Sequence, residues 1–270
     1  NTKSGIENTK DFAVHSAVSA FRAEESLRKF ALNKTADAAN ATVNVAKSGF
    51  GRIGHPGTAN PPAAQGLKFS ESKGASELAY ARNNAKVGDV YKFPDGKEWK
   101  VADVEDKSNG FRAIALRPVD SNDKRVIVAF AGSDEGRDWF DNVAQGAGFK
   151  PSQYRDAVNF ANNWKGIAGD DVRLTGHSLG GGLASYASVK TGLKATAINS
   201  APLSIPNLGL DPRVIGRVTQ YYVPGEVLSV ENAANPVDFR VGNSIAVEGR
   251  YSIFNPKSVV RNHSLGNVAP

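Results

Sequence analysis

The sequence predicts an α/β protein: a mostly parallel sheet flanked by helices, with a helical extension at the N-terminus. Short runs of apolar and β-branched residues alternate with segments whose apolar residues recur at helical spacing. One run, 124–130, is almost continuously apolar, as expected of a strand buried at the centre of a sheet. A chain of 270 residues is long enough for one large α/β domain and such an extension.

The N-terminal part of the chain differs in composition from the rest. Apolar residues over 11–31 follow helical spacing, which predicts one or two helices there. The stretch 48–65 is rich in Gly, Pro, Ala and Asn, which is typical of a linker. We therefore expect residues 1–65 to form a helical extension and linker, and residues 66–270 to form the α/β domain.

The elements expected in the α/β domain follow in chain order. A short helix over 76–82 precedes a hairpin whose turn is Pro94-Asp95-Gly96. Strands are expected over 89–93, 99–104, 111–116, 124–130, 171–175, 195–199 and 214–223. Helices are expected over 154–164, with Ser152 as the N-cap, and over 183–190, ended by Gly192.

The segment Gly176-His177-Ser178-Leu179-Gly180 joins a predicted strand to a predicted helix. It matches Gly-x-Ser-x-Gly, the nucleophile elbow, in which the serine lies on a sharp and strained turn. The two glycines leave room for that turn, and the helix N-terminus directs free N–H groups towards a developing oxyanion. Ser178 is therefore the candidate nucleophile and Leu179 a candidate oxyanion donor. The alternative is a Gly-rich turn with an idle serine.

A serine nucleophile needs a general base, most often His. The chain has four: His15, His55, His177 and His263. On this kind of sheet the triad follows the chain order Ser, acid, His, and only His263 obeys that order. His15 and His55 precede the predicted catalytic sheet. His177 lies beside the nucleophile and is expected to point away from it as a packed or hydrogen-bonded side chain.

The acid is expected just after the strand 214–223. Glu226 occupies that position in the sequence. Asp238 is the alternative acid and Asp211 a further rival, and Asp is the commoner residue in this role.

A second oxyanion donor is expected in the loop after strand 124–130, where the chain reads Ala131-Gly132-Ser133. The backbone N–H of Ser133 can meet an oxyanion opposite the N–H of Leu179. Asp138 and Trp139 follow and are expected to fix this loop. The alternative is an ordinary polar turn.

These motifs resemble the lipase class 3 family of α/β-hydrolases. The resemblance covers about residues 75–270 and rests on Phe130-Ala131-Gly132-Ser133, Asp138-Trp139, the elbow 176–181, Glu226 and His263. The segment 222–228 and the long N-terminal region resemble secreted phospholipases A of Gram-negative bacteria. Two residues depart from the family pattern: Ala131 stands where Arg is usual, and Glu226 stands where Asp is usual.

The resemblance implies an α/β-hydrolase fold and ester hydrolysis of glycerolipids, by a triad of Ser178, Glu226 and His263. It predicts a phospholipase A1-type activity on a membrane or micelle surface. The alternatives are a triacylglycerol lipase, a general carboxylesterase, or an inactive hydrolase fold that serves as a binding module. The resemblance also implies a secreted bacterial protein and a possible cognate accessory or immunity protein. The chemistry needs neither a metal nor a cofactor.

The formal net charge of +6 favours anionic partners. Lys and Arg are scattered without a dense run, and no nucleic-acid-binding module is legible, which argues against nucleic acid. We expect mild attraction to anionic membranes, which favours phospholipids as the predicted substrates.

Cysteine is absent from the chain, which excludes disulfides and thiol chemistry. The sequence contains neither a recognisable signal peptide nor an apolar run long enough to cross a bilayer. Because Met is also absent, we expect a processed or trimmed product.

Overall fold

The computed structural model describes residues 66–81, 84–132, 151–204, 217–224, 226, 228, 238–239, 241–251 and 261–269. The extension and linker predicted for residues 1–65 lie outside this part of the chain, as do Ser133, Asp138, Trp139 and Asp211. The division into two domains at residue 65 therefore stays a prediction.

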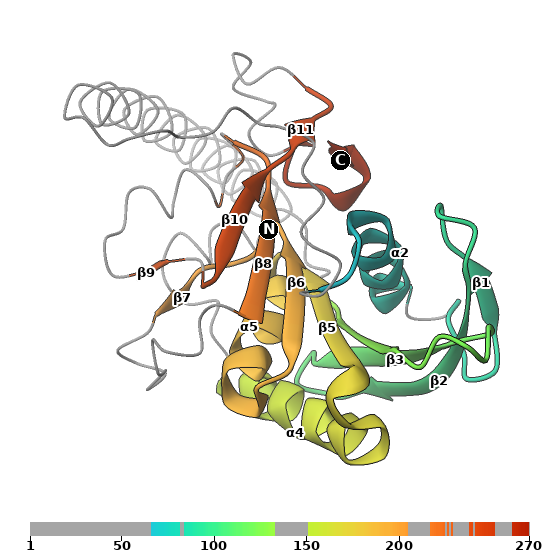
Figure 1. The fold of residues 1–270 in the computed structure, drawn as a ribbon. Coiled ribbons are helices and arrows are strands. Elements are labelled where there is room, and N and C mark those ends of the chain that lie inside the picture. The colour runs from blue at the N-terminus through green and yellow to red at the C-terminus, as the bar shows by residue number, and fades with distance from the viewer. Residues whose placement is uncertain are drawn as a thin grey trace, which may run out of the picture. The chain divides into compact units, whose positions relative to one another are not determined.

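An eight-stranded sheet forms the centre of the fold, in the order β1-β2-β3-β4-β5-β6-β8-β10 (Figure 1). Its strands are β1 (Val90–Lys92), β2 (Glu98–Asp106), β3 (Arg112–Pro118), β4 (Val126–Phe130), β5 (Val172–His177), β6 (Lys194–Ile198), β8 (Val218–Tyr222) and β10 (Asn243–Ala246). Neighbours from β1 to β4 pair antiparallel, and neighbours from β4 to β10 pair parallel. The prediction of a mostly parallel sheet is confirmed, and the tight hairpins explain its antiparallel edge.

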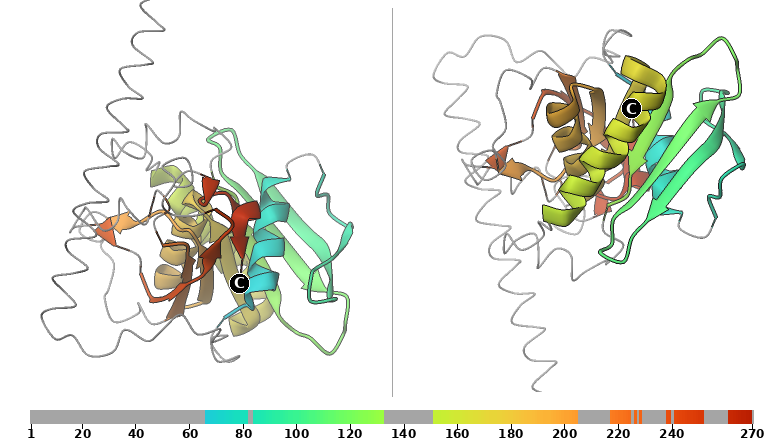
Figure 2. Two further views of the ribbon diagram at one scale, coloured as in Figure 1. Left: turned by 90° about the horizontal axis from the view of Figure 1, so that it is seen from above. Right: turned by 90° about the horizontal axis from the view of Figure 1, so that it is seen from below.

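Helices cover both faces of this sheet. Figure 2 shows α2 (Phe69–Tyr80) on one side and α4 (Pro151–Ala168) on the other. The strand β3 contributes side chains to the core on both faces of the sheet, because its successive side chains point in opposite directions. Ala113 and Ala115 join the core beneath α4 and α5 (Leu179–Thr191), whereas Ile114 and Leu116 join the core beneath α2. This arrangement is the α/β-hydrolase fold expected from the sequence.

Charged side chains fix both ends of α2. The buried Glu71 carboxylate receives Arg125 Nη2 at 2.7 Å and Arg125 Nη1 at 3.0 Å, and it also accepts the N–H of Lys68 at 3.0 Å. Burial alone would raise the pKa of Glu71, but these hydrogen bonds and the charge on Arg125 lower it overall. At the other end, Arg112 Nε donates to the carbonyl of Ala79 at 2.8 Å. Tyr80, the last residue of α2, is held in place as a result.

Two of the predicted helices begin at other residues than expected. α2 begins at Phe69, seven residues before the predicted start, because Glu71 receives the free N–H at its N-terminus. α4 begins at Pro151, so Ser152 is not its N-cap, and a proline suits the first helical position. Gly192 does follow α5 with a left-handed φ of 76°, as predicted.

The strand β10 was not predicted. Its residues Asn243–Ala246 are exposed or half-buried at the edge of the sheet and carry no apolar run. The short pairs of β7 (Leu203–Ser204) with β9 (Asp238–Phe239) and of β11 (Glu248–Gly249) with β12 (Val268–Ala269) were also missed. Within the described residues, no helix has both the length and the apolar character that a membrane crossing requires.

Candidate active site

Ser178 lies on a sharp turn between β5 and α5. Its φ of 59° and ψ of −128° are a strained conformation for a residue with a side chain. A Cβ atom on Gly176 would overlap the carbonyl of Gly180, and one on Gly180 would overlap the carbonyl of Phe130 in β4. Both glycines of the motif are therefore required by close backbone contacts, and the turn has the geometry of a nucleophile elbow.

Because the extra methyl group has no room, we expect Gly180→Ala to lower the free energy of unfolding by about 2 kcal/mol. The matched control is Gly166→Ala in α4, where an added Cβ meets nothing within 4 Å. That change should raise the free energy of unfolding by about 0.5–1 kcal/mol, because Ala favours helix more than Gly does. Urea unfolding curves of the two variants measure both effects, and equal stability of the two would contradict the packing argument.

Three buried side chains meet at the elbow. His263 Nε2 lies 3.0 Å from Ser178 Oγ, and His263 Nδ1 lies 2.7 Å from Glu226 Oε2. A carboxylate can only accept a hydrogen bond, so Nδ1 of His263 carries the proton and Nε2 is left to accept the Ser178 hydroxyl. Glu226 is fully buried and also accepts the N–H of Leu228 at 3.0 Å. Asp238, the alternative acid, belongs to β9, which pairs with β7.

His177 makes hydrogen bonds on both ring nitrogens. Its Nε2 lies 2.6 Å from the carbonyl oxygen of His263, and its Nδ1 lies 3.0 Å from the hydroxyl of Tyr80. The carbonyl can only accept, so Nε2 is protonated and Nδ1 accepts from Tyr80. This is the packed, hydrogen-bonded role expected for His177. Burial, together with the repulsion that His263 exerts when its own ring is protonated, lowers the pKa of His177 to about 3.

This shift makes stability depend on pH. The pKa of His177 falls from its ordinary value of 6.5 to about 3 on folding, so the unfolded chain binds the proton more tightly. The stabilisation is complete above pH 6.5 and is lost as the pH falls towards 3, at up to about 1.4 kcal/mol per pH unit. Urea unfolding at a series of pH values should therefore show a shallower decline for His177→Gln than for the unmodified chain. Parallel declines would show that His177 does not contribute.

Leu179 is the first residue of α5. The first N–H groups of a helix have no acceptor within the helix, and its N-terminus carries a partial positive charge, which suits a developing oxyanion. The second predicted donor, Ser133, follows the last described residue of its loop. The preceding Gly132 passes against the elbow, since a Cβ there would overlap the Tyr80 hydroxyl and meet the His177 carbonyl oxygen at 2.9 Å. Both oxyanion assignments stay predictions.

The sequence reasoning missed Tyr80 and Asn199. Asn199 directly follows β6, is fully buried and has a φ of 41°. Its Nδ2 donates to the carbonyls of Asn262 at 3.1 Å and His263 at 3.3 Å. An Asn at the carboxyl end of a parallel strand, where ligands and catalytic groups gather, is the signal that could have pointed to it.

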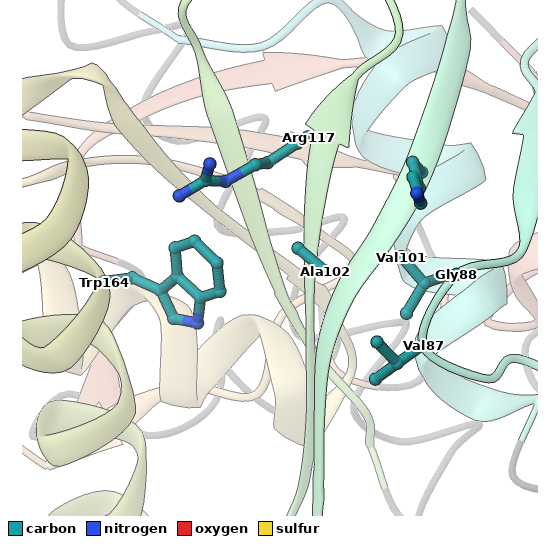
Figure 3. Close-up of a pocket in the computed structure, with 7 residues that line it drawn as sticks. Val87, Gly88, Val101, Ala102, Arg117 and Trp164 are labelled. Carbon is teal, nitrogen blue, oxygen red and sulfur yellow. The ribbon is translucent and has the colours of Figure 1, made fainter.

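A hollow of about 430 Å³ lies elsewhere, beside the antiparallel edge of the sheet (Figure 3). In Figure 3 the guanidinium of Arg117 lies against the indole of Trp164, 5.3 Å from a ring centroid. Arg117 is near the end of β3, where the strand lies far from the carboxyl ends of β4 and β5. None of the seven residues that line the hollow belongs to the Ser178 cluster, so the hollow is not part of this site.

A known protein family matches the part of the chain that contains Ser178 and Glu226. The model of a phospholipase-like family, the Tle-like phospholipase domain, matches residues 72–255. The chain belongs to this family. The matched range contains Ser178 and Glu226 but ends before His263, so the assignment of the base depends on the geometry given above.

Similar individual proteins include an extracellular phospholipase A1 of Serratia liquefaciens, 35% identical over 156 residues. That match covers 54% of this chain and 48% of the relative, so the chain spans about half the length of the curated relative it matches. Solved structures include a Rhizomucor miehei lipase in a propeptide complex, with a TM-score of 0.49, 11% identity, and 73% and 76% of the two chains covered. A triacylglycerol lipase of Penicillium expansum matches with a TM-score of 0.45, 12% identity, and 74% and 90% coverage.

Proposed function

We propose that this protein is a serine hydrolase of phospholipase A1 type, which cleaves an acyl ester of a glycerophospholipid. The observation that carries the proposal is the buried series Glu226–His263–Ser178, joined by contacts of 2.7 Å and 3.0 Å. These contacts give the hydrogen-bond order acid, imidazole, hydroxyl that nucleophilic acyl transfer requires. Membership of the phospholipase-like family supports the same class of reaction.

The reaction has two halves. In the first, Ser178 Oγ attacks the ester carbonyl carbon while His263 Nε2 takes the hydroxyl proton, and Glu226 stabilises the imidazolium that forms. The N–H of Leu179 and a donor at Ser133 hold the oxyanion. When the tetrahedral intermediate collapses, the C–O bond to the glycerol backbone breaks and His263 protonates the departing lysophospholipid oxygen.

In the second half, water is the nucleophile. His263 removes a proton from water as it attacks the acyl-Ser178 ester, and the fatty acid leaves as Ser178 Oγ regains its proton from His263. The acyl-enzyme divides one difficult hydrolysis into two easier steps.

The substrate class rests on two further observations. The similar Serratia protein is named a phospholipase A1, and the net charge of +6 favours approach to anionic lipid surfaces. A triacylglycerol lipase or a general carboxylesterase would use the same triad. The distinction lies in which acyl ester enters the site, rather than in the catalytic residues.

The decisive experiment uses phosphatidylglycerol vesicles with different acyl chains at the two glycerol positions. We expect release of the fatty acid from position 1, and little release from a triglyceride emulsion under the same conditions. Faster hydrolysis of triglyceride would favour the lipase alternative. Failure of a fluorophosphonate to label Ser178, together with no hydrolysis of any ester, would instead favour an inactive binding module.

We also propose that the protein acts outside the cell that makes it, since the similar Serratia protein is extracellular. Detection of the protein in the culture medium of its producing cells tests this. We further propose that residues 1–65 form a separate N-terminal extension. We also propose that the protein binds a cognate accessory or immunity protein. Removing residues 1–65 should impair export or partner binding while leaving hydrolysis of a short soluble ester intact.

A further inference from the structure

The main-chain carbonyl of His263 is held from two strands. His177 Nε2, at the end of β5, donates to this oxygen at 2.6 Å, and Asn199 Nδ2, just after β6, donates to it at 3.3 Å. All three residues are at most 6% exposed. Hydrogen bonds sheltered from water in this way restrict motion more than exposed ones. The segment that carries His263 is thereby attached to the rigid centre of the sheet.

Asn199 also reaches the segment that precedes Glu226. Its Oδ1 accepts the N–H of Val223 at 2.9 Å, and the carbonyl of Val223 accepts the N–H of Glu226 at 3.2 Å. One amide side chain therefore connects the segment of the acid with the segment of the base. The two segments are 37 residues apart in the sequence at Glu226 and His263.

The same residues are tied to the backbone of the elbow. The N–H of Ser178 donates to the carbonyl of Ile198 at 3.1 Å, and the N–H of Ala201 donates to the carbonyl of Ser178 at 2.9 Å. These two bonds flank Asn199. On the other side, His177 is the residue next to Ser178 in the chain. A series of contacts therefore starts at Ser178, passes through His177 or Asn199 to the carbonyl of His263, and returns to Ser178 through the imidazole.

We propose that His177 and Asn199 are positioning residues that set the distance between His263 Nε2 and Ser178 Oγ. The inference rests on the proposed hydrolase function. Neither residue takes part in proton transfer in this scheme, because both act on the main chain of His263. A displacement of about 1 Å between reacting groups can lower a rate by about 100-fold, so loss of these hydrogen bonds should appear in kcat.

The competing interpretation is that His177 and Asn199 merely fill the core. Two matched substitutions separate the interpretations at His177: Gln keeps an N–H donor at similar reach, whereas Leu fills the space without one. At Asn199 the informative change is Gly, which adopts the φ of 41° without steric cost and removes only the amide.

The kinetic test measures hydrolysis of p-nitrophenyl butyrate by the full chain at a temperature below every melting point. We expect kcat to fall by about 10- to 100-fold in His177→Leu and Asn199→Gly, with KM within about twofold of the unmodified value. His177→Gln should retain at least about a third of kcat, because it keeps the donor. The inference is overturned if the Leu and Gly variants lose thermal stability but keep the original kcat. It is also overturned if Gln is as impaired as Leu.

A second measurement does not depend on turnover. The proton on His263 Nδ1, which bridges to Glu226, should give a low-field NMR resonance in the unmodified chain and in His177→Gln. We expect this resonance to broaden or vanish in His177→Leu and Asn199→Gly, and an unchanged resonance in both would overturn the inference. An unmodified chain that hydrolyses no ester would contradict the proposed function, while the resonance would still decide the positioning role.

Discussion

Replacing Ser178 by Ala should lower kcat for phospholipid hydrolysis by about 10⁴-fold or more, while the free energy of unfolding changes by less than about 1 kcal/mol. The substitution removes the oxygen that forms the acyl-enzyme, which is the hydroxyl oxygen that lies 3.0 Å from His263 Nε2. The backbone φ of 59° imposes much the same strain on Ala as on Ser, so the fold should persist. Fatty-acid release and a urea unfolding curve of the same preparation give both quantities.

Ser188→Ala is the matched control, since Ser188 is another buried serine and lies within α5, the helix that follows Ser178. Its hydroxyl donates to the carbonyl of Leu193, two residues beyond the last residue of the helix. Its loss should cost about 1 kcal/mol of stability and leave kcat within about twofold. If Ser178→Ala hydrolysed phospholipid at the same rate as Ser188→Ala, the nucleophile assignment would be wrong.

Replacing Glu226 by Gln should lower kcat by about 10³- to 10⁴-fold. The amide has nearly the shape of the carboxylate, but it carries no charge to stabilise the imidazolium. It can also present an N–H to Nδ1 of His263, which would move the ring proton to Nε2 and prevent that atom from accepting the Ser178 hydroxyl. KM should change little, because the carboxylate is fully buried behind His263. Steady-state kinetics on a soluble short-chain ester measures both constants.

The control for this change is Asp238→Asn, because Asp238 is the other residue that the sequence offers as the acid of the triad. We expect its kcat to stay within about twofold of the unmodified value, because Glu226 already receives Nδ1 of His263 at 2.7 Å. A large loss in Asp238→Asn with little effect in Glu226→Gln would show that the acid is Asp238. Comparable losses in both variants would point to a structural requirement at β9 as well.

The parts of the fold that could be predicted from the sequence are those whose residues are buried in the centre of the sheet. The parallel strands β4, β5, β6 and β8 are largely buried. Short runs rich in apolar, β-branched or aromatic residues therefore mark them in the sequence, and β4 is apolar throughout. Parallel strands also end at one edge of the sheet, so Ser178 after β5 and Glu226 after β8 come to the same edge. Glu226 could therefore be chosen from its position after a strand, whereas His263 could be chosen because it is the one histidine that follows both Ser178 and Glu226 in the chain.

The parts that were missed depend on contacts between distant segments. His177 and His263 are 86 residues apart, and Asn199 and His263 are 64 apart, so no local pattern reveals that their atoms meet. The early start of α2 depends on Arg125, which lies 54 residues from Glu71. The edge strand β10 is exposed or half-buried, so its residues need not form an apolar run, and such an edge strand resembles a loop in sequence.

Ser178 and Asn199 are the two non-glycine residues with positive φ in the described part of the chain, and both belong to the site. Such conformations cost on the order of 1–2 kcal/mol each, and the surrounding contacts maintain them. Substitutions that relax either backbone would add heat resistance at the expense of turnover. Engineering for thermostability should therefore begin at permissive positions such as Gly166 in α4, where an added methyl group has open space.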